Sequence, residues 1–285
     1  MRPLPDVWVH RRPTGVTLEA ASGAGSGRAR LRSSSWFHVL WVLAHSDFRA
    51  RYRAQALGVV WSLLNPLVMM TILSVIFTRV FRSEVKNFPV FMLIGLVLWQ
   101  WIQTSLNSGT VVLVNNAEII KRTVFPRQLL PVSVVFSYAI NFSVESLIVL
   151  AAAVVWPDAF TISPALLMVP IALAILAVLL VGLTMASSVL NVIYRDVAYL
   201  VSTTLMLLYW LTPLVYPFEI VSEKYRRILI FNPFAAILIG VRDAVMLGVW
   251  PRPMVWVGML APTAVVVVAG WLIFRHYERI ALDYV

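Results

Sequence analysis

Few side chains in this sequence could carry out covalent chemistry. The chain of 285 residues has no cysteine, which excludes disulfides, iron–sulfur clusters and thiol catalysis, and it has only four histidines. The ATP-binding patterns GxxxxGKS and GxxxxGKT, the zinc pattern HExxH and the hydrolase pattern GxSxG do not occur in it. We therefore expect no catalytic residue, no metal ligand and no cofactor on this chain.

A carboxylate lies within one of the long apolar segments. Asn141 and Glu145 are four residues apart, so they share one face of a helix. A carboxyl group is costly in lipid and must face the helix bundle or a cavity. Glu145 could be a structural hydrogen-bond partner, a coupling switch or a proton relay, and the sequence leaves the three open.

A cluster of arginines follows an amphipathic segment near the N-terminus. Residues 36–53 read WFHVLWVLAHSDFRARYR, with an apolar face too short to cross a bilayer. We expect an interfacial helix over residues 36–55, with Arg49, Arg51 and Arg53 at headgroup level. These arginines either anchor the helix or bind the phosphates of a lipid pyrophosphate, since guanidinium forms bidentate hydrogen bonds with phosphate.

Aromatic side chains make up 12% of the chain. Most Trp and Tyr in membrane proteins lie in the interfacial belts, and that reading suits Trp99 and Trp101. Others could line a pore, because aromatic faces give sugar rings apolar contact without tight hydrogen bonds. The candidates for such a substrate channel are Trp61, Phe77, Tyr209, Trp210 and Tyr216.

The bilayer must be the solvent for most of the chain. The sequence is 60% hydrophobic and 13% charged, with a mean hydropathy of +0.85, whereas soluble domains carry roughly twice that share of charge. An all-α integral membrane fold follows, with a transmembrane domain over residues 56–275. Its six spans are predicted at 57–80, 90–114, 129–156, 164–190, 197–217 and 254–275.

The segments outside these spans have distinct compositions. Residues 1–35 are polar and basic, which predicts a disordered tail, and residues 276–285 form a second tail. Residues 213–251 contain two apolar pieces, each too short to cross, separated by Asn232 and Pro233. We therefore expect re-entrant helices between the fifth and sixth spans.

The net charge of +10 does not indicate a nucleic-acid partner, because the charges lie in short clusters between apolar runs and suit membrane lipid and topology. With both termini in the cytoplasm, the inner loops hold Lys121, Arg122 and further arginines. The loop WPDAFTISP lies outside and has neither Lys nor Arg. The basic residues that oppose this orientation are Arg79, Arg82, Lys86, Lys224, Arg226, Arg227, Arg242 and Arg252.

Several stretches together resemble the membrane-spanning subunit of ABC-2 type exporters for polysaccharides and lipid-linked glycans. This family serves the export of O-antigen, capsule, teichoic acid and galactan. The matching stretches cover nearly everything from residue 36 onward; they are DFRARYRAQALGVVWSLLNPL, NNAEIIKRTVFPRQLLP, LNVIYRDVAYL, LTPLVYPFEIV, LIFNPFAAILIGVRDAV and FRHYERIALDYV.

The resemblance implies a homodimer in the bacterial inner membrane that works with two copies of a separate ATPase, which binds ATP and Mg²⁺. Its substrate would be a polyprenyl-pyrophosphate-linked polysaccharide. The loop near residues 115–126 would be the coupling helix, with Glu118, Lys121 and Arg122 facing the ATPase. The stretch 213–251 would form gate helices on the outer side.

Two other classes of function compete with an export permease. A membrane-embedded polyprenyl-phosphate glycosyltransferase needs clustered carboxylates, and the sequence has no DxD or DDxxD cluster. An ion-coupled lipid-glycan flippase predicts inverted repeats, and none is visible. The identity of the glycan, and whether it moves whole or as a growing chain, stay open.

Overall fold

The computed structural model describes residues 40–46, 60–80, 82, 85–122 and 126–284, and all regular structure in these ranges is helical. Residues 40–46 form a short helix ahead of α2. The long and intermediate helices are α2 (Val60–Val75), α3 (Phe88–Asn115), α5 (Leu129–Val155), α6 (Met168–Ile193), α7 (Val197–Leu211) and α10 (Pro253–Tyr284). The short ones are α4 (Ala117–Arg122), α8 (Glu223–Ile230) and α9 (Pro233–Arg242), and π-helical turns extend α2 as η1 (Ile76–Val80) and α9 as η5 (Asp243–Leu247).

Five helical segments are long and apolar enough to cross a bilayer, which needs about 20 residues. They correspond to the first four and the last of the predicted spans, and the all-α membrane fold is confirmed. The segments are Val60–Val80 (21 residues), Phe88–Asn115 (28), Leu129–Val155 (27), Pro164–Ile193 (30) and Pro253–Ile280 (28).

The predicted fifth span, 197–217, was wrong in length. Helix α7 ends at Leu211 after 15 residues, which corresponds to about 22 Å against a hydrocarbon core of about 30 Å. Pro213 explains the end, because proline disfavours helical backbone in the residue before it, and Thr212 is extended with φ −87° and ψ 136°.

The stretch between α7 and α10 folds into two short helices that meet at a sharp angle. Helix α8 has eight residues and α9 has ten, and the two are bent by 102° at Phe231 and Asn232. The Asn232 side chain caps α9 by accepting from Phe234 N, and its amide donates to Thr212 Oγ1, 3.1 Å away. The bend is therefore tied to the end of α7.

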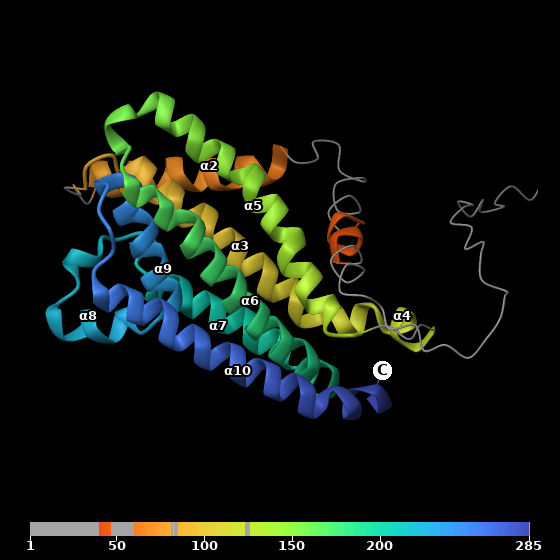
Figure 1. Cartoon of the computed structure of the whole chain (residues 1–285). Helices are drawn as coiled ribbons and strands as arrows, with labels where there is room; N and C mark the ends of the chain where they lie inside the picture. Colours follow the sequence, from red (N-terminus) through yellow and green to blue (C-terminus); the bar gives the residue numbers. More distant parts are fainter. Residues whose placement is uncertain (1–39, 47–59, 81, 83–84, 123–125, 285) are drawn as a thin grey trace, which may run out of the picture.

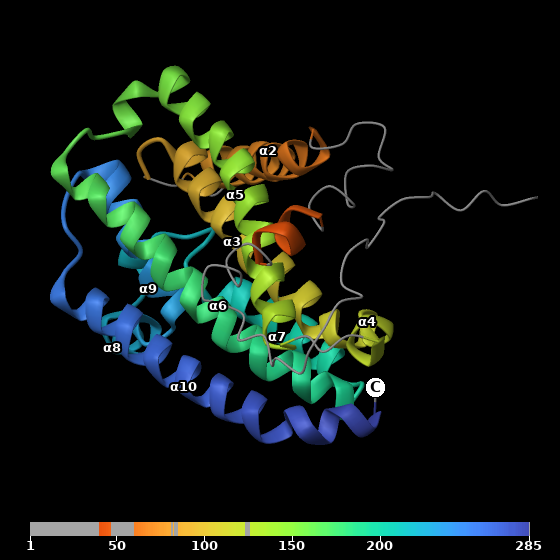
Figure 2. The same cartoon turned by 45° about the vertical axis from the view of Figure 1, so that its right-hand side comes forward.

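The bundle has two distinct ends (Figures 1 and 2). One end, which we call the α4 end, carries α4, the connection between α6 and α7, and the C-terminus. The opposite end, the α8 end, carries α8 and the connections from α2 to α3 and from α5 to α6. Consecutive long helices run in opposite directions, so the connection from α7 to α10 also lies at the α8 end.

Helix α3 lies at the centre of the fold. Its apolar window is 78% buried, whereas that of α2 is 11% buried and that of α5 is 17% buried. Elsewhere small residues bring helices close together: a Cβ on Gly270 of α10 would lie 2.1 Å from the Gly182 carbonyl oxygen of α6. Such backbone contact through glycine is typical of helix pairs in membranes.

Candidate functional site: a polar stripe on the central helix

A single face of α3 is not buried by the bundle. Residues 91–99 are all buried, but further along the helix polar side chains recur at the three- and four-residue spacing of one helical face. Gln103 is exposed and its stripe neighbours are half-buried. We call this set the α3 polar stripe; it comprises Gln100, Gln103, Thr104, Asn107 and Ser108.

The stripe is held in place by hydrogen bonds to neighbouring helices. Ser202 of α7 donates to Asn107 Oδ1 over 3.0 Å. Ser108 Oγ and Tyr138 Oη of α5 form a hydrogen bond over 2.6 Å, in which either hydroxyl can donate. These hydrogen bonds place the stripe against α7 and α5.

The position of the stripe constrains what it can face. Gln103 lies near the middle of α3. At that depth in a bilayer, a polar group without a hydrogen-bond partner costs roughly 1–3 kcal/mol of free energy on scales derived from protein mutations, and more in pure hydrocarbon. On α7, Ser202, Thr203 and Thr204 are exposed as well. Polar residues inside membrane segments face a bundle interior or a water-filled cavity. The stripe therefore indicates a hydrated surface at mid-membrane depth.

The five aromatic channel candidates do not form a single cluster. Trp61 is 54% exposed near the start of α2, at the opposite end of the bundle from Trp210, which is 62% exposed at the end of α7. Phe77 stacks on Phe88 with ring centroids 5.4 Å apart and packs against the core. A pore-lining role for these residues stays a prediction.

The remaining two candidates, Tyr209 and Tyr216, lie beside Trp210. The Tyr209 ring packs edge-on against the rings of Trp99 and Trp210, with ring centroids 5.6 and 5.4 Å apart. The Tyr216 hydroxyl donates to the carbonyl oxygens of Trp210 and Leu211 over 3.2 and 3.4 Å. Tyr216 therefore caps the C-terminal end of α7, a role that no sequence pattern indicated.

The predicted interfacial arginines Arg49, Arg51 and Arg53 lie outside the described residues. The preceding helix of residues 40–46 exposes Trp41 and Val42 and buries Ala44. Trp41 and His45 stack with ring centroids 5.9 Å apart. One helical face is thus buried and the other carries exposed aromatic and aliphatic side chains.

The predicted coupling segment contains a six-residue helix, α4, at the end of the bundle. Glu118 lies in its first turn and Lys121 is exposed, while the side chain of Arg122 lies outside the description. Ile120 is buried in a small apolar cluster with residues of the adjoining helix ends, and this cluster anchors α4 to the bundle; it includes Val112, Leu113, Leu130, Val189 and Phe274.

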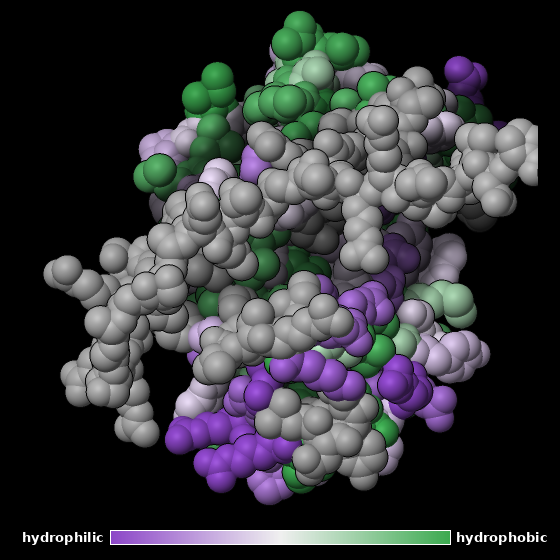
Figure 3. Space-filling view, turned by 90° about the vertical axis from the view of Figure 1, so that its right-hand side faces the viewer, coloured by the Kyte–Doolittle hydropathy of each residue, from purple (hydrophilic) through white to green (hydrophobic). Residues whose placement is uncertain are grey.

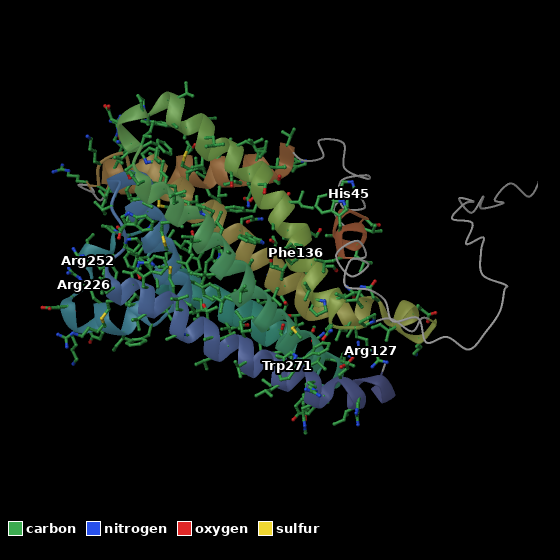
Figure 4. The ribbon with its side chains drawn as sticks, in the orientation of Figure 1. His45, Arg127, Phe136, Arg226, Arg252 and Trp271 are labelled. Carbon is green, nitrogen blue, oxygen red and sulfur yellow. The ribbon has the colours of Figure 1, made fainter. Side chains whose placement is uncertain are left out.

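The α4 end is also joined by an ion pair that the sequence analysis missed. Arg127 Nη1, at the start of α5, lies 3.7 Å from Glu278 Oε1 near the end of α10. Figure 4 shows Arg127 at this end of the molecule, whereas Arg226 and Arg252 lie at the α8 end. Viewed from the α4 end, hydrophilic residues gather over the half of the face that holds α4 and the end of α10 (Figure 3).

Glu145 faces the bundle, as expected for a carboxyl group inside a span. It is fully buried, and its Oε1 accepts from Asn141 Nδ2 over 2.7 Å. Its Oε2 has no hydrogen-bond partner within the described part of the chain. The three roles considered for Glu145 stay open.

Arg242, predicted among the basic residues of the outer side, lies in helix α9 and is buried rather than displayed in a loop. It is 6% exposed on α9 and donates to the carbonyl oxygens of Pro213, Leu214 and Phe91, the last two over 2.8 Å. Its guanidinium carbon lies 3.4 Å above the centre of the Phe91 ring. The break after α7 frees carbonyl groups in a low-dielectric interior, and a guanidinium with five donors satisfies them.

Among the residues that the structure describes, no group of three or more His, Cys, Asp or Glu could hold a metal ion. The expectation that the chain carries no cofactor stays a prediction.

A bundle of five helices long and apolar enough to span a bilayer defines a multi-pass membrane protein. Comparison with known proteins gives the family. Residues 38–246 match the family described as "ABC-2 type transporter", and the chain belongs to this family.

Two relatives of this chain are both named as O-antigen export permeases. One from Klebsiella pneumoniae, named O-antigen export system permease protein RfbA, is 33% identical over 215 residues, which cover 74% of this chain and 82% of the relative. A protein of the same name from Myxococcus xanthus is 32% identical over 205 residues, or 70% of this chain and 77% of the relative.

Proposed function

We propose that this chain is the permease subunit of an ATP-driven ABC exporter that moves a polyprenyl-pyrophosphate-linked polysaccharide of the O-antigen type across the bacterial inner membrane. The observation that carries the proposal is the family membership together with relatives named as O-antigen export permeases over most of both chains. The α3 polar stripe supports it, because a glycan needs a hydrated path at a depth where lipid offers none.

The active form in this proposal is a homodimer. In one chain Gln103, Ser202, Thr203 and Thr204 are exposed, and the rest of the polar stripe is half-buried rather than enclosed. Two copies with these faces opposed would surround a passage lined by amides and hydroxyls. Trp61, Phe77, Tyr209, Trp210 and Tyr216 are the residues we propose for weak contacts with sugar rings along the path.

The energy comes from two copies of a separate ATPase that binds ATP and Mg²⁺. The α4 end is proposed as the cytoplasmic side, with Glu118, Lys121 and Arg122 as the docking surface for the ATPase. Lys121 is exposed, and the buried Ile120 transmits any displacement of α4 to the ends of the spans. Both termini are cytoplasmic in this orientation, and the α8 end faces outward.

Arg49, Arg51 and Arg53 are proposed to lie at the inner leaflet, where they bind the lipid pyrophosphate or anchor the interfacial helix. The two roles differ in their requirement for geometry, because lysine keeps the charge but loses the bidentate fork. Export that fails in the triple Arg→Lys variant supports phosphate binding, whereas full export assigns the cluster to anchoring.

The proposal is tested in sealed vesicles that contain the purified chain with or without the partner ATPase. Translocation of the lipid-linked glycan and hydrolysis of ATP are expected only when both subunits are present. Translocation by this chain alone, driven by an ion gradient, would identify a flippase instead. Glycan elongation by the chain alone would identify a glycosyltransferase.

A further inference from the structure

A second polar site lies at the α8 end, apart from the α3 polar stripe. A cavity of about 280 Å³ opens between the start of α3, the connection from α5 to α6, the segment after α7 and the turn η5. Pockets for drug-sized ligands typically measure about 300–1,000 Å³, so this cavity lies just below that range and suits only a single small ligand. Its polar lining residues are Lys86, Asn87, Asp158, Arg242 and Asp243.

The walls of this cavity are fixed by hydrogen bonds between distant segments. Thr161 binds η5 twice, through its N–H to Val245 O at 2.9 Å and through its hydroxyl to Met246 O at 3.0 Å. Ser163 Oγ donates to Gly248 O over 2.9 Å. On the opposite wall, Arg242 holds the carbonyl groups of Pro213 and Leu214. A cavity with fixed walls loses little conformational entropy when a ligand binds.

Two uncommon backbone conformations border the same cavity. The η5 turn (Asp243–Leu247) is π-helical, a conformation that occurs mostly as single turns and frequently at functional sites. Asn87, which precedes α3, has φ 54° and ψ 45° in the left-handed region, which residues other than Gly, Asn and Asp seldom adopt. Such conformations cluster at ligand-binding sites, where the surrounding structure holds them.

The lining selects a neutral ligand with hydroxyl groups. The formal charges of Lys86 and Arg242 offset those of Asp158 and Asp243, so neither an anion nor a cation gains net attraction. Carboxylates accept hydrogen bonds from hydroxyl groups, and the Lys86 ammonium donates them. The remaining wall is apolar and suits the C–H surface of a ring; it includes Phe91, Pro213, Pro217, Phe218, Ile239 and Met246.

We propose that this cavity binds a single neutral sugar unit of the transported glycan at the α8 end, where the polymer leaves the passage. That the sugar belongs to a transported glycan rests on the proposed function. The site itself is distinct from the α3 polar stripe. Asp158 and Lys86 are exposed and would contact the hydroxyl groups. Arg242 shapes the wall, because its donors already bind backbone carbonyl groups.

Saturation-transfer difference NMR on the full chain in lipid nanodiscs tests the site. The probes are the methyl α-glycosides of D-mannose, D-galactose and D-glucose, and N-acetyl-D-glucosamine, each at 10 mM. At least one sugar is expected to receive saturation, and Asp158→Ala is expected to reduce the transfer fivefold or more. Glu223→Ala is the matched control, because this exposed carboxylate on α8 does not line the cavity, and it should leave the transfer unchanged.

Three results would overturn the proposal: no transfer to any of the four sugars, equal transfer in the Asp158→Ala variant, or displacement of the sugar by 10 mM inorganic phosphate, which would reveal an anion site. Elution of Asp158→Ala as a monodisperse species of wild-type size shows that a lost signal is not lost folding. Binding is measured without the ATPase, so a failed export assay leaves this result standing. Export without sugar binding removes this site alone.

Discussion

The buried guanidinium of Arg242 is the residue on which the arrangement of the α8 end depends. It joins α9 to the segment after α7 and to α3 through three carbonyl oxygens. Gly95 allows this approach, since a Cβ there would lie 2.6 Å from Arg242 Nη2. A side chain that satisfies three backbone acceptors at once fixes the position of a chain segment that has no helical hydrogen bonds of its own.

Replacement of Arg242 by Met should destabilise the protein by at least about 2–3 kcal/mol, because each hydrogen bond to a charged group contributes roughly 1.5–3 kcal/mol and three acceptors lose their donor. Arg242→Lys should recover part of the loss, since an ammonium reaches fewer of the three acceptors. The measurement is thermal unfolding of the purified chain in detergent. Arg252→Met, an exposed arginine at the same end, is the control and should change stability by less than about 0.5 kcal/mol. Equal Tm values for the Arg242 and Arg252 variants would contradict the account.

At the scale of elements, sequence patterns predicted the positions of the helices better than the contacts between them. Hydropathy located the five long spans because the bilayer thickness sets one length for all of them. Pro213 marked the end of α7, yet the apolar residues beyond it extended the predicted span to residue 217. The helical spacing of Gln100, Gln103 and Asn107 was visible in the sequence and was overlooked. The contacts of Arg242 could not be predicted, because they join residues 28, 29 and 151 positions apart.

Helix α4 and the end of α10 form the element through which an ATPase would act. The pair of Arg127 and Glu278 is partly exposed, with side-chain exposures of 27% and 34%, so its contribution to stability is about 1 kcal/mol or less. Its consequence is mechanical: it links the start of α5 to α10, next to the buried Ile120 of α4. Motion of α4 would thereby reach two spans together.

Charge reversal on α4 tests this coupling. The double variant Glu118→Lys, Lys121→Glu should insert normally but lose co-purification with the ATPase, or lose stimulation of ATP hydrolysis by at least tenfold, because the docking surface changes sign at two positions. The control is the corresponding reversal on α8, Glu223→Lys with Lys224→Glu, which should co-purify as the wild type does. Unchanged stimulation in the α4 variant would show that the ATPase docks elsewhere.

The whole molecule is asymmetric across the membrane. The α4 end carries the end of α10 and the ion pair, and the α8 end carries the bent helices and the sugar-sized cavity. The proposed orientation assigns these ends to the cytoplasm and to the outside. Arg242 no longer opposes it, because this residue is buried rather than displayed in an outer loop.

The absence of cysteine from the sequence makes the orientation easy to measure. An impermeant thiol reagent added to intact spheroplasts should label Asp158→Cys, at the α8 end, and should not label Lys121→Cys, on α4, until the membrane is opened. Both side chains are exposed, so both should react fully after permeabilisation. The reverse pattern would invert the proposed topology.

The central claim is that the glycan passes along the α3 polar stripe under the control of ATP. The most direct measurement is glycan translocation by the assembled complex carrying Gln103→Cys, before and after modification with a bulky hydrophilic thiol reagent. The account predicts that Gln103→Cys reacts, because the side chain is exposed to a hydrated surface, and that modification lowers translocation at least tenfold while ATP hydrolysis continues. Val154→Cys, on the exposed face of α5, is the control and should translocate normally after the same treatment. Unchanged translocation by a complex in which Gln103→Cys is fully modified would contradict the account.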